Sequence, residues 1–194
     1  NIKTDKNPEH IVQKNVRMYK FKEPVENEVT SSKAFKKFRG TQFEIKIYSK
    51  SAQYSLPDNV LRVELKIVKS QYLQKLGIWS LNDLKDRVTY ETLIGDLWQK
   101  IEDLMIIDDF KYDLINEKCV MDLRNYIDPH YWINLKENAS NSTYYRRQHE
   151  CKVLIKDLQL DMTKKTILNL LNSKFRELMG EECLECDPVY QNAA

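Results

Sequence analysis

The sequence predicts an α+β protein, with a small antiparallel sheet in its N-terminal third and a helical C-terminal region. Apolar and polar residues alternate with a period of two over much of residues 43–67, and a helical period follows from residue 70. A hydrophobic fraction of 42% in 194 residues is enough to form a packed core. We therefore expect a strand-bearing part over residues 1–69 and a helical part over residues 70–194.

Two segments carry the strand prediction. Their apolar side chains alternate with Glu44, Lys46 and Tyr48 in the first segment and with Arg62, Glu64 and Lys66 in the second. A turn-like stretch with Pro57 lies between them, so the simplest arrangement is an antiparallel pair. One face then packs on helices, and the other face presents the six polar residues. Residues 16–21 are predicted as an edge strand.

The helical part divides at capping and breaking residues. We expect helices near residues 70–76, 79–84, 89–104, 114–127, 144–158 and 161–178. Thr89 is the predicted cap of the third helix, and Gly77 and Gly180 are predicted to end the first and the last. Pro129 ends the fourth, because the residue before a proline disfavours the helical conformation.

Composition excludes several classes of function. Lys plus Arg total 31 and Asp plus Glu total 29, so a basic surface requires local clustering. The four glycines form neither a dinucleotide-binding nor a Walker motif. No apolar run approaches the roughly 20 residues that span a bilayer. We expect a cytoplasmic protein with reduced cysteines and no membrane partner.

Tyr48 is the residue with the clearest catalytic potential. A tyrosine hydroxyl that attacks a DNA phosphodiester needs a proton acceptor and nearby positive charge. Glu64 is the candidate acid, Glu44 its alternative, and the candidate cations are Lys46, Lys50, Arg62 and Lys66. The competing interpretation is an exposed tyrosine among cross-strand ion pairs, which are common on half-buried sheets.

Two basic segments are further candidates for DNA binding. The first combines Phe35 and Phe38 with Lys33, Lys36, Lys37 and Arg39. Its lysines would neutralise phosphates and its phenylalanines would stack on bases. An amphipathic segment with both phenylalanines in the core explains the same pattern. The second segment has Arg146 and Arg147 after two tyrosines, and a helix would turn its members to different sides.

Metal-binding motifs are sparse. The three histidines form no two-histidine zinc motif. Cys183 and Cys186 form one CxxC, which is half of a zinc site or part of an inert tail.

The segment FRGTQFEIKIYSKSAQYSLPDNVLRVELKI, residues 38–67, resembles rolling-circle replication initiators of phages and plasmids, of the filamentous-phage type. The shared features are a Tyr-x-Lys at residues 48–50 and a Leu-Arg-x-Glu at residues 61–64. The segments LQKLGIWSLNDL, residues 73–84, and YWINLKENASNSTYYRRQHECKVLI, residues 131–155, are also similar to the family, and the resemblance spans roughly residues 38–179. It implies a protein that nicks DNA through a tyrosine-linked 5′ phosphate, with DNA and host replication proteins as partners.

The resemblance also implies catalytic roles for Tyr48 and Glu64, phosphate contacts for Lys50 and Arg62, and a divalent metal, Mg or Mn. These endonucleases take metal ligands from a His-hydrophobe-His strand, which this chain lacks. A C-terminal fragment of a longer initiator is one explanation. Three functions remain open: a nicking initiator or a piece of one, a non-catalytic DNA-binding or replisome module, and an unrelated helical interaction protein.

Overall fold

The computed structural model describes residues 1–25, 34–111 and 115–180. Its strands are β1 (Ile2–Lys3), β2 (Val16–Tyr19), β3 (Phe35–Arg39), β4 (Phe43–Ser49), β5 (Val60–Ile67) and β6 (Leu104–Ile106). Its helices are α1 (Pro8–His10), the π-helix η1 (Ile11–Asn15), α2 (Lys50–Tyr54), α3 (Ser70–Lys75), the 3-10 helix η2 (Leu81–Lys85), α4 (Arg87–Glu102), α5 (Glu117–Tyr126), α6 (Pro129–Asn138), α7 (Asn141–Asp157) and α8 (Met162–Leu178). The α+β class is confirmed.

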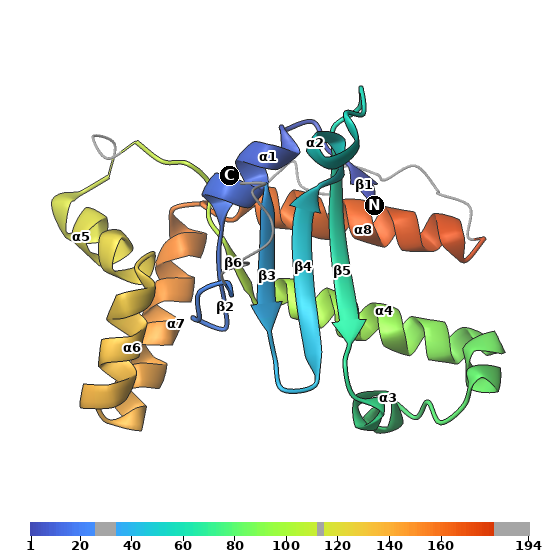
Figure 1. The fold of residues 1–194 in the computed structure, drawn as a ribbon. Coiled ribbons are helices and arrows are strands. Elements are labelled where there is room, and N and C mark those ends of the chain that lie inside the picture. Colours follow the sequence, from blue (N-terminus) through green and yellow to red (C-terminus); the bar gives the residue numbers. More distant parts are fainter. Residues whose placement is uncertain (26–33, 112–114, 181–194) are drawn as a thin grey trace, which may run out of the picture.

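The main sheet is antiparallel, with strand order β1-β5-β4-β3. Ile45 and Ile47 are fully buried on one face, so alternation places their neighbours Lys46 and Tyr48 on the other. Helices α4 and α8 cross behind the sheet in Figure 1, and the polar strand face is turned toward the viewer. The predicted pairing of the segments around residues 45 and 63 is confirmed.

The first hydrophobic core lies between this sheet and the helices behind it. It joins Ile45 and Leu61 of the sheet to Ile101 of α4 and to Ile167 and Leu171 of α8. Burial of such side chains is the main favourable contribution to folding. Residues on both sides of position 69 share this core, so the sheet and helices α4 and α8 form one packed unit.

Strands β2 and β6 form a separate antiparallel ribbon between two cores. Val16 and Ile106 pack into the first core, whereas Met18 and Met105 pack into the second. The second core is completed by α5, α6 and α7 around Trp132, whose Nε1 donates to the Tyr126 carbonyl at 2.9 Å. None of the described helices is long and apolar enough to cross a membrane.

Several predicted elements change in the structure. The predicted edge strand 16–21 pairs with β6 and stands outside the main sheet. Asp86, not Thr89, caps α4, because its carboxylate accepts from Val88 N at 3.3 Å. Leu104 belongs to β6 rather than to that helix. Asn116 caps α5, which begins at Glu117. Gly77 and Gly180 have the positive φ angles expected of left-handed helix ends.

Candidate functional site

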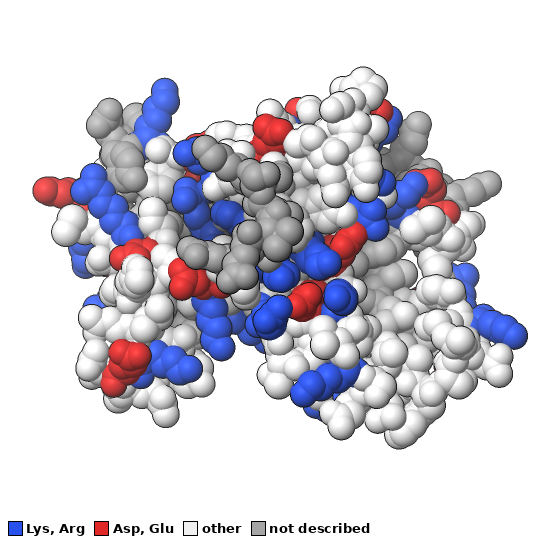
Figure 2. Space-filling view, in the orientation of Figure 1, with Lys and Arg blue, Asp and Glu red and all other residues white. Residues whose placement is uncertain are grey.

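The polar face of the main sheet is defined here by eight residues of three neighbouring strands. They are Lys37 and Arg39 of β3, Glu44, Lys46 and Tyr48 of β4, and Arg62, Glu64 and Lys66 of β5. Five are cations and two are carboxylates. Figure 2 shows basic side chains interspersed with acidic ones across the middle of this face. The predicted clustering of Tyr48 with charged residues therefore exists in the fold.

A hydrogen-bonded network surrounds the Tyr48 phenol. Its Oη donates to Glu64 Oε1 at 2.9 Å, and Arg62 Nε lies 2.6 Å from the same carboxylate oxygen. The register explains this contact: Tyr48 pairs directly with Arg62, which places Glu64 on the diagonal of the same face. The guanidinium of Arg62 also lies 6.0 Å from the centroid of the Tyr48 ring. One carboxylate thus accepts from both a phenol and a guanidinium.

The phenol of Tyr48 is a weaker acid than a free tyrosine. Burial, followed by the hydrogen bond to the Glu64 carboxylate, raises the pKa of Tyr48 to about 12, although Arg62 acts in the opposite direction. Little phenolate therefore exists at neutral pH. Nucleophilic attack by this oxygen requires a base that removes the proton during the reaction, and Glu64 lies within hydrogen-bonding reach.

A small cavity opens beside Tyr48 and Glu64. It encloses about 200 Å³ and is also lined by Phe35, Lys46 and Gln53. Ser49 is the last residue of β4 and the N-cap of α2, because its hydroxyl accepts a hydrogen bond from Ala52 N at 3.1 Å. The helix that begins after Ser49 brings Gln53 to the cavity. The volume lies below the 300–1,000 Å³ typical of pockets for whole small molecules. It suits a single phosphate group better than a complete nucleotide.

Three lysines of the polar face have no acidic partner among the described residues: Lys37, Lys46 and Lys66. Lys37 and Lys46 stand directly opposite each other across β3 and β4. Like charges at such a pair destabilise a sheet. By contrast, Arg39 pairs with Glu44 at 3.1 Å and Arg62 with Glu64. Of the three lysines, Lys46 lines the cavity, where it stands opposite Glu64 across β4 and β5, whereas Lys66 stands opposite Glu44.

Lys36 does not belong to the polar face. The register places it opposite Ile47, on the side of the first core, and its Nζ donates to the carbonyls of Gln13 and Val16. Burial, with a smaller effect of Arg17, lowers the pKa of Lys36 to about 8. The prediction that Lys36 contacts DNA together with Lys37 and Arg39 is therefore corrected by strand geometry.

Other predicted cations also lie outside the strands of this face. The strand ends at Ser49, so Lys50 begins α2, and its Nζ lies 5.7 Å from the Tyr54 ring centroid. Arg146 and Arg147 are on α7, and both lie within ion-pair distance of Glu150. Lys33, Cys183 and Cys186 fall outside the described residues.

The described residues do not provide the ligands that the implied divalent metal needs. Glu64 is bonded to Tyr48 and Arg62, and Glu44 is bonded to Arg39. Within residues 1–25, 34–111 and 115–180, no group of three or more His, Cys, Asp or Glu side chains could hold a metal ion. Mg²⁺ takes many of its oxygen ligands from water and substrate phosphates, but it still needs one or two protein carboxylates, and both carboxylates of the polar face are engaged by other side chains. We therefore derive no catalytic step through a metal.

The sequence indicated Phe35 only as a base-stacking residue of the basic segment, and it did not reveal that Phe35 and Gln53 line the cavity beside Tyr48. The Phe35 ring lies beside that of Tyr48, tilted by 33° with ring centroids 5.7 Å apart, because the two residues pair across β3 and β4. The alternation of Phe35, Lys37 and Arg39 was the available signal for β3, but Lys36 on the core side obscured it. Gln53 lies in the short helix α2, within the segment between β4 and β5 that was expected to be a turn.

No family model, curated protein or solved structure matches the chain.

Proposed function

We propose that the polar face binds a DNA strand and that Tyr48 attacks one of its phosphodiesters, as part of DNA replication initiation in the cytoplasm. The observation that carries this proposal is the contact between the Tyr48 hydroxyl and the Glu64 carboxylate beside a phosphate-sized cavity. A nucleophile within reach of a base, with cations beside it, is the arrangement that phosphoryl transfer uses. The family resemblance around residues 48–50 and 61–64 supports the same reaction.

The proposed reaction balances with the chain's own groups. Tyr48 Oη forms a bond to phosphorus while its proton passes to Glu64, and the bond from phosphorus to the 3′ oxygen breaks. The 3′ oxygen takes a proton from Glu64, which restores the carboxylate. Lys46 offsets the negative charge that develops on the phosphoryl oxygens. The downstream strand stays joined to Tyr48 through its 5′ phosphate, and attack by the free 3′ hydroxyl reverses the step.

A covalent-adduct assay tests this proposal. The full chain is incubated with random-sequence single-stranded DNA labelled at its 3′ end, with Mg²⁺, with Mn²⁺ and with a chelator, and is then denatured. We expect a labelled protein band from wild type and none from Tyr48→Phe. DNA labelled at its 5′ end should give only a shortened free strand. Tyr54→Phe is the matched control, since Tyr54 is exposed on the neighbouring α2 and should leave the band unchanged.

A second candidate is phosphate binding without cleavage. Two observations favour it. The raised pKa of Tyr48 makes its phenol harder to deprotonate, and Glu64 already accepts from both Tyr48 and Arg62. Salt-sensitive DNA binding without an adduct would support this function, and replacement of Lys37 and Lys46 should reduce its salt dependence. For a single strand, each lost phosphate contact reduces the magnitude of the negative slope of log K against log salt by about 0.7. Absence of DNA binding at moderate salt would contradict both candidates.

A further inference from the structure

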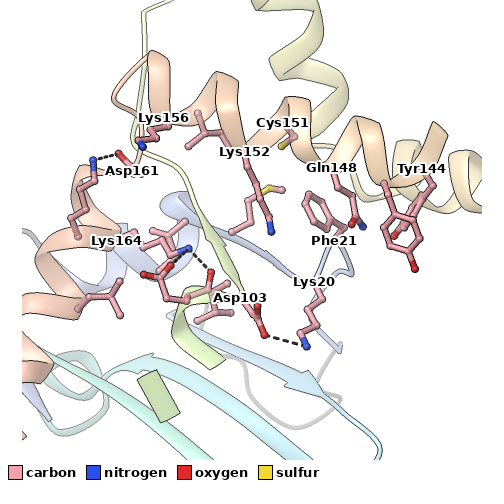
Figure 3. Close-up of a pocket in the computed structure, with 18 of the residues that line it drawn as sticks. Lys20, Phe21, Asp103, Tyr144, Gln148, Cys151, Lys152, Lys156, Asp161 and Lys164 are labelled. Carbon is pink, nitrogen blue, oxygen red and sulfur yellow. Dashed lines mark hydrogen bonds and ion pairs between the residues drawn. The ribbon is translucent and has the colours of Figure 1, made fainter. Parts of the chain in front are cut away.

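A second and larger pocket lies between the β2–β6 ribbon and helices α7 and α8 (Figure 3). It encloses about 660 Å³, within the range typical of small-molecule sites. Its apolar lining includes Leu104 and Ile106 of β6 and Cys151 of α7, and its charged lining consists of six lysines and three carboxylates. It shares no lining residue with the cavity beside Tyr48.

Four residues on one side of α7 line this pocket, and their side chains differ in chemistry from one end of the pocket to the other. Tyr144, Gln148, Lys152 and Lys156 recur every four residues, so they share one helix face, and all four line the pocket. Figure 3 shows them running from the aromatic end beside Phe21 to the lysine-rich end beside Asp161. At 1.5 Å per residue, Tyr144 and Lys156 lie about 18 Å apart along the axis. The order is an aromatic ring, an amide and two ammonium groups.

Positive charge in the pocket is compensated on one side only. Lys20 pairs with Asp103 at 3.1 Å, Lys164 with Glu102 at 3.1 Å, and Lys165 with Asp161 at 2.9 Å. Lys136, Lys152 and Lys156 have no acidic partner in the part of the chain that the structure describes. The uncompensated charge therefore comes from α6 and α7, where it faces the ribbon across the pocket.

A strained turn forms the opposite wall. Tyr19 and Lys22 exchange backbone hydrogen bonds of 2.9 and 3.0 Å, which leaves Lys20 and Phe21 as a two-residue turn. Both turn residues have positive φ angles, 48° and 60°, which glycine or asparagine adopts more readily. The side chains of Lys20 and Phe21 both line the pocket. The ring centroids of Phe21 and Trp132 are 4.3 Å apart. Backbone strain of this kind is concentrated at functional sites.

We infer that this pocket binds a nucleotide, that is, a planar base joined to phosphate groups. The base lies among Phe21, Tyr144 and Tyr145, where aromatic rings provide stacking surfaces. The Gln148 amide can both donate to and accept from a base edge. Lys152 and Lys156 bind the phosphates, because ammonium groups without carboxylate partners form charge-assisted hydrogen bonds with phosphate oxygens. The source is either a free nucleotide or a nucleotide within a single strand.

Isothermal titration of the full chain with separate probes tests this inference. The probes are ATP, dTTP, inorganic tripolyphosphate, adenosine and a short single-stranded oligonucleotide. We expect a nucleotide or the oligonucleotide to bind more tightly than tripolyphosphate or adenosine alone. Binding by ATP or dTTP identifies a free nucleotide as the ligand. Binding by the oligonucleotide alone identifies a strand as the ligand if the lysine variant described next weakens it, because the polar face is also proposed to bind DNA.

Charge reversal at two exposed lysines locates the site. Lys152→Glu combined with Lys156→Glu should weaken binding about tenfold or more. Circular dichroism and the melting temperature verify that this variant is folded. Lys75→Glu combined with Lys85→Glu, at two exposed lysines of α3 and η2 outside the pocket, is the charge-matched control and should change the affinity less than about twofold. The inference is overturned if no base-containing probe binds at millimolar concentration, if tripolyphosphate binds as tightly as the nucleotides, or if both variants weaken binding equally. The covalent adduct at Tyr48 is measured in a separate assay with other variants, so either proposal can fail without the other.

Discussion

The Tyr48 hydroxyl donates a hydrogen bond to Glu64 Oε1 at 2.9 Å, joining strands β4 and β5 on the polar face of the sheet. This contact links the fold to the proposed chemistry. The register that buries Ile47 and Val63 on one side brings the phenol and the carboxylate together on the other. A shift of one residue between the strands would turn the side chains of one strand to the opposite faces.

Glu64→Gln should lower the pKa of Tyr48 from about 12, because the carboxylate that holds the phenolic proton is lost. The pKa should remain above 10, since burial is the largest cause of the shift. Ultraviolet titration of phenolate formation measures this, with Tyr48→Phe in both backgrounds isolating the signal of Tyr48. An identical Tyr48 titration in wild type and Glu64→Gln would show that the two side chains do not interact in solution.

Ile45→Asp should unfold the protein, because it buries a charge in the first core, where Ile45 is fully buried. The expected loss is more than about 4 kcal/mol in the free energy of unfolding. Val63→Asp should act in the same direction. Urea denaturation measures both variants. Lys46→Gln, on the opposite face of the same strand, is the control and should change stability by about 0.5 kcal/mol or less. A stable Ile45→Asp variant would contradict the assigned faces.

Lys36 should make stability rise with pH above neutrality. Its pKa in the fold is about 8, below the ordinary 10.5, so between these values the unfolded chain binds more protons than the folded one. The stabilisation is complete above pH 10.5 and is lost as the pH falls through 8. The free energy of unfolding of wild type should therefore rise between pH 7 and 9 relative to Lys36→Met. Parallel stability curves for the two proteins would show that Lys36 is not buried as described.

Lys20→Asn should stabilise the protein by about 1 kcal/mol, because asparagine adopts the left-handed conformation at lower cost than lysine. The ion pair that is lost, with Asp103, is partly exposed and contributes little. The melting temperature measures the effect. Lys14→Asn, at a residue whose φ angle is not positive, is the control and should bring no gain. A lower melting temperature for Lys20→Asn would contradict the strained turn.

The sequence predicted β4 and β5 because each strand is buried on one side only, which produces strict alternation. It did not predict β6, because Leu104, Met105 and Ile106 are all buried and form a continuous apolar run. Such a run after a helix cannot be distinguished from a further helical turn by periodicity. Strand β3 was hidden for a different reason, because half-buried Lys36 places a charge on the core side and breaks the alternation.

The candidate site was predictable in part. Tyr48, Arg62 and Glu64 lie on two strands that are neighbours in sequence and pair in register, so alternation alone places them on one face. The second pocket was not predictable, because it unites the turn at Lys20 with α6, α7 and α8, which lie more than a hundred residues further along the chain. The one part of this pocket that the sequence displays is the four-residue spacing from Tyr144 to Lys156.

In the proposed reaction, Tyr48 becomes covalently linked to a DNA strand. Mass spectrometry of the protein after incubation with single-stranded DNA, nuclease trimming and proteolysis measures this directly. We predict a 5′-linked nucleotide on the peptide that contains Tyr48, attached to that tyrosine. A nucleotide on a different residue, or unmodified Tyr48 in protein that binds DNA, would contradict the account.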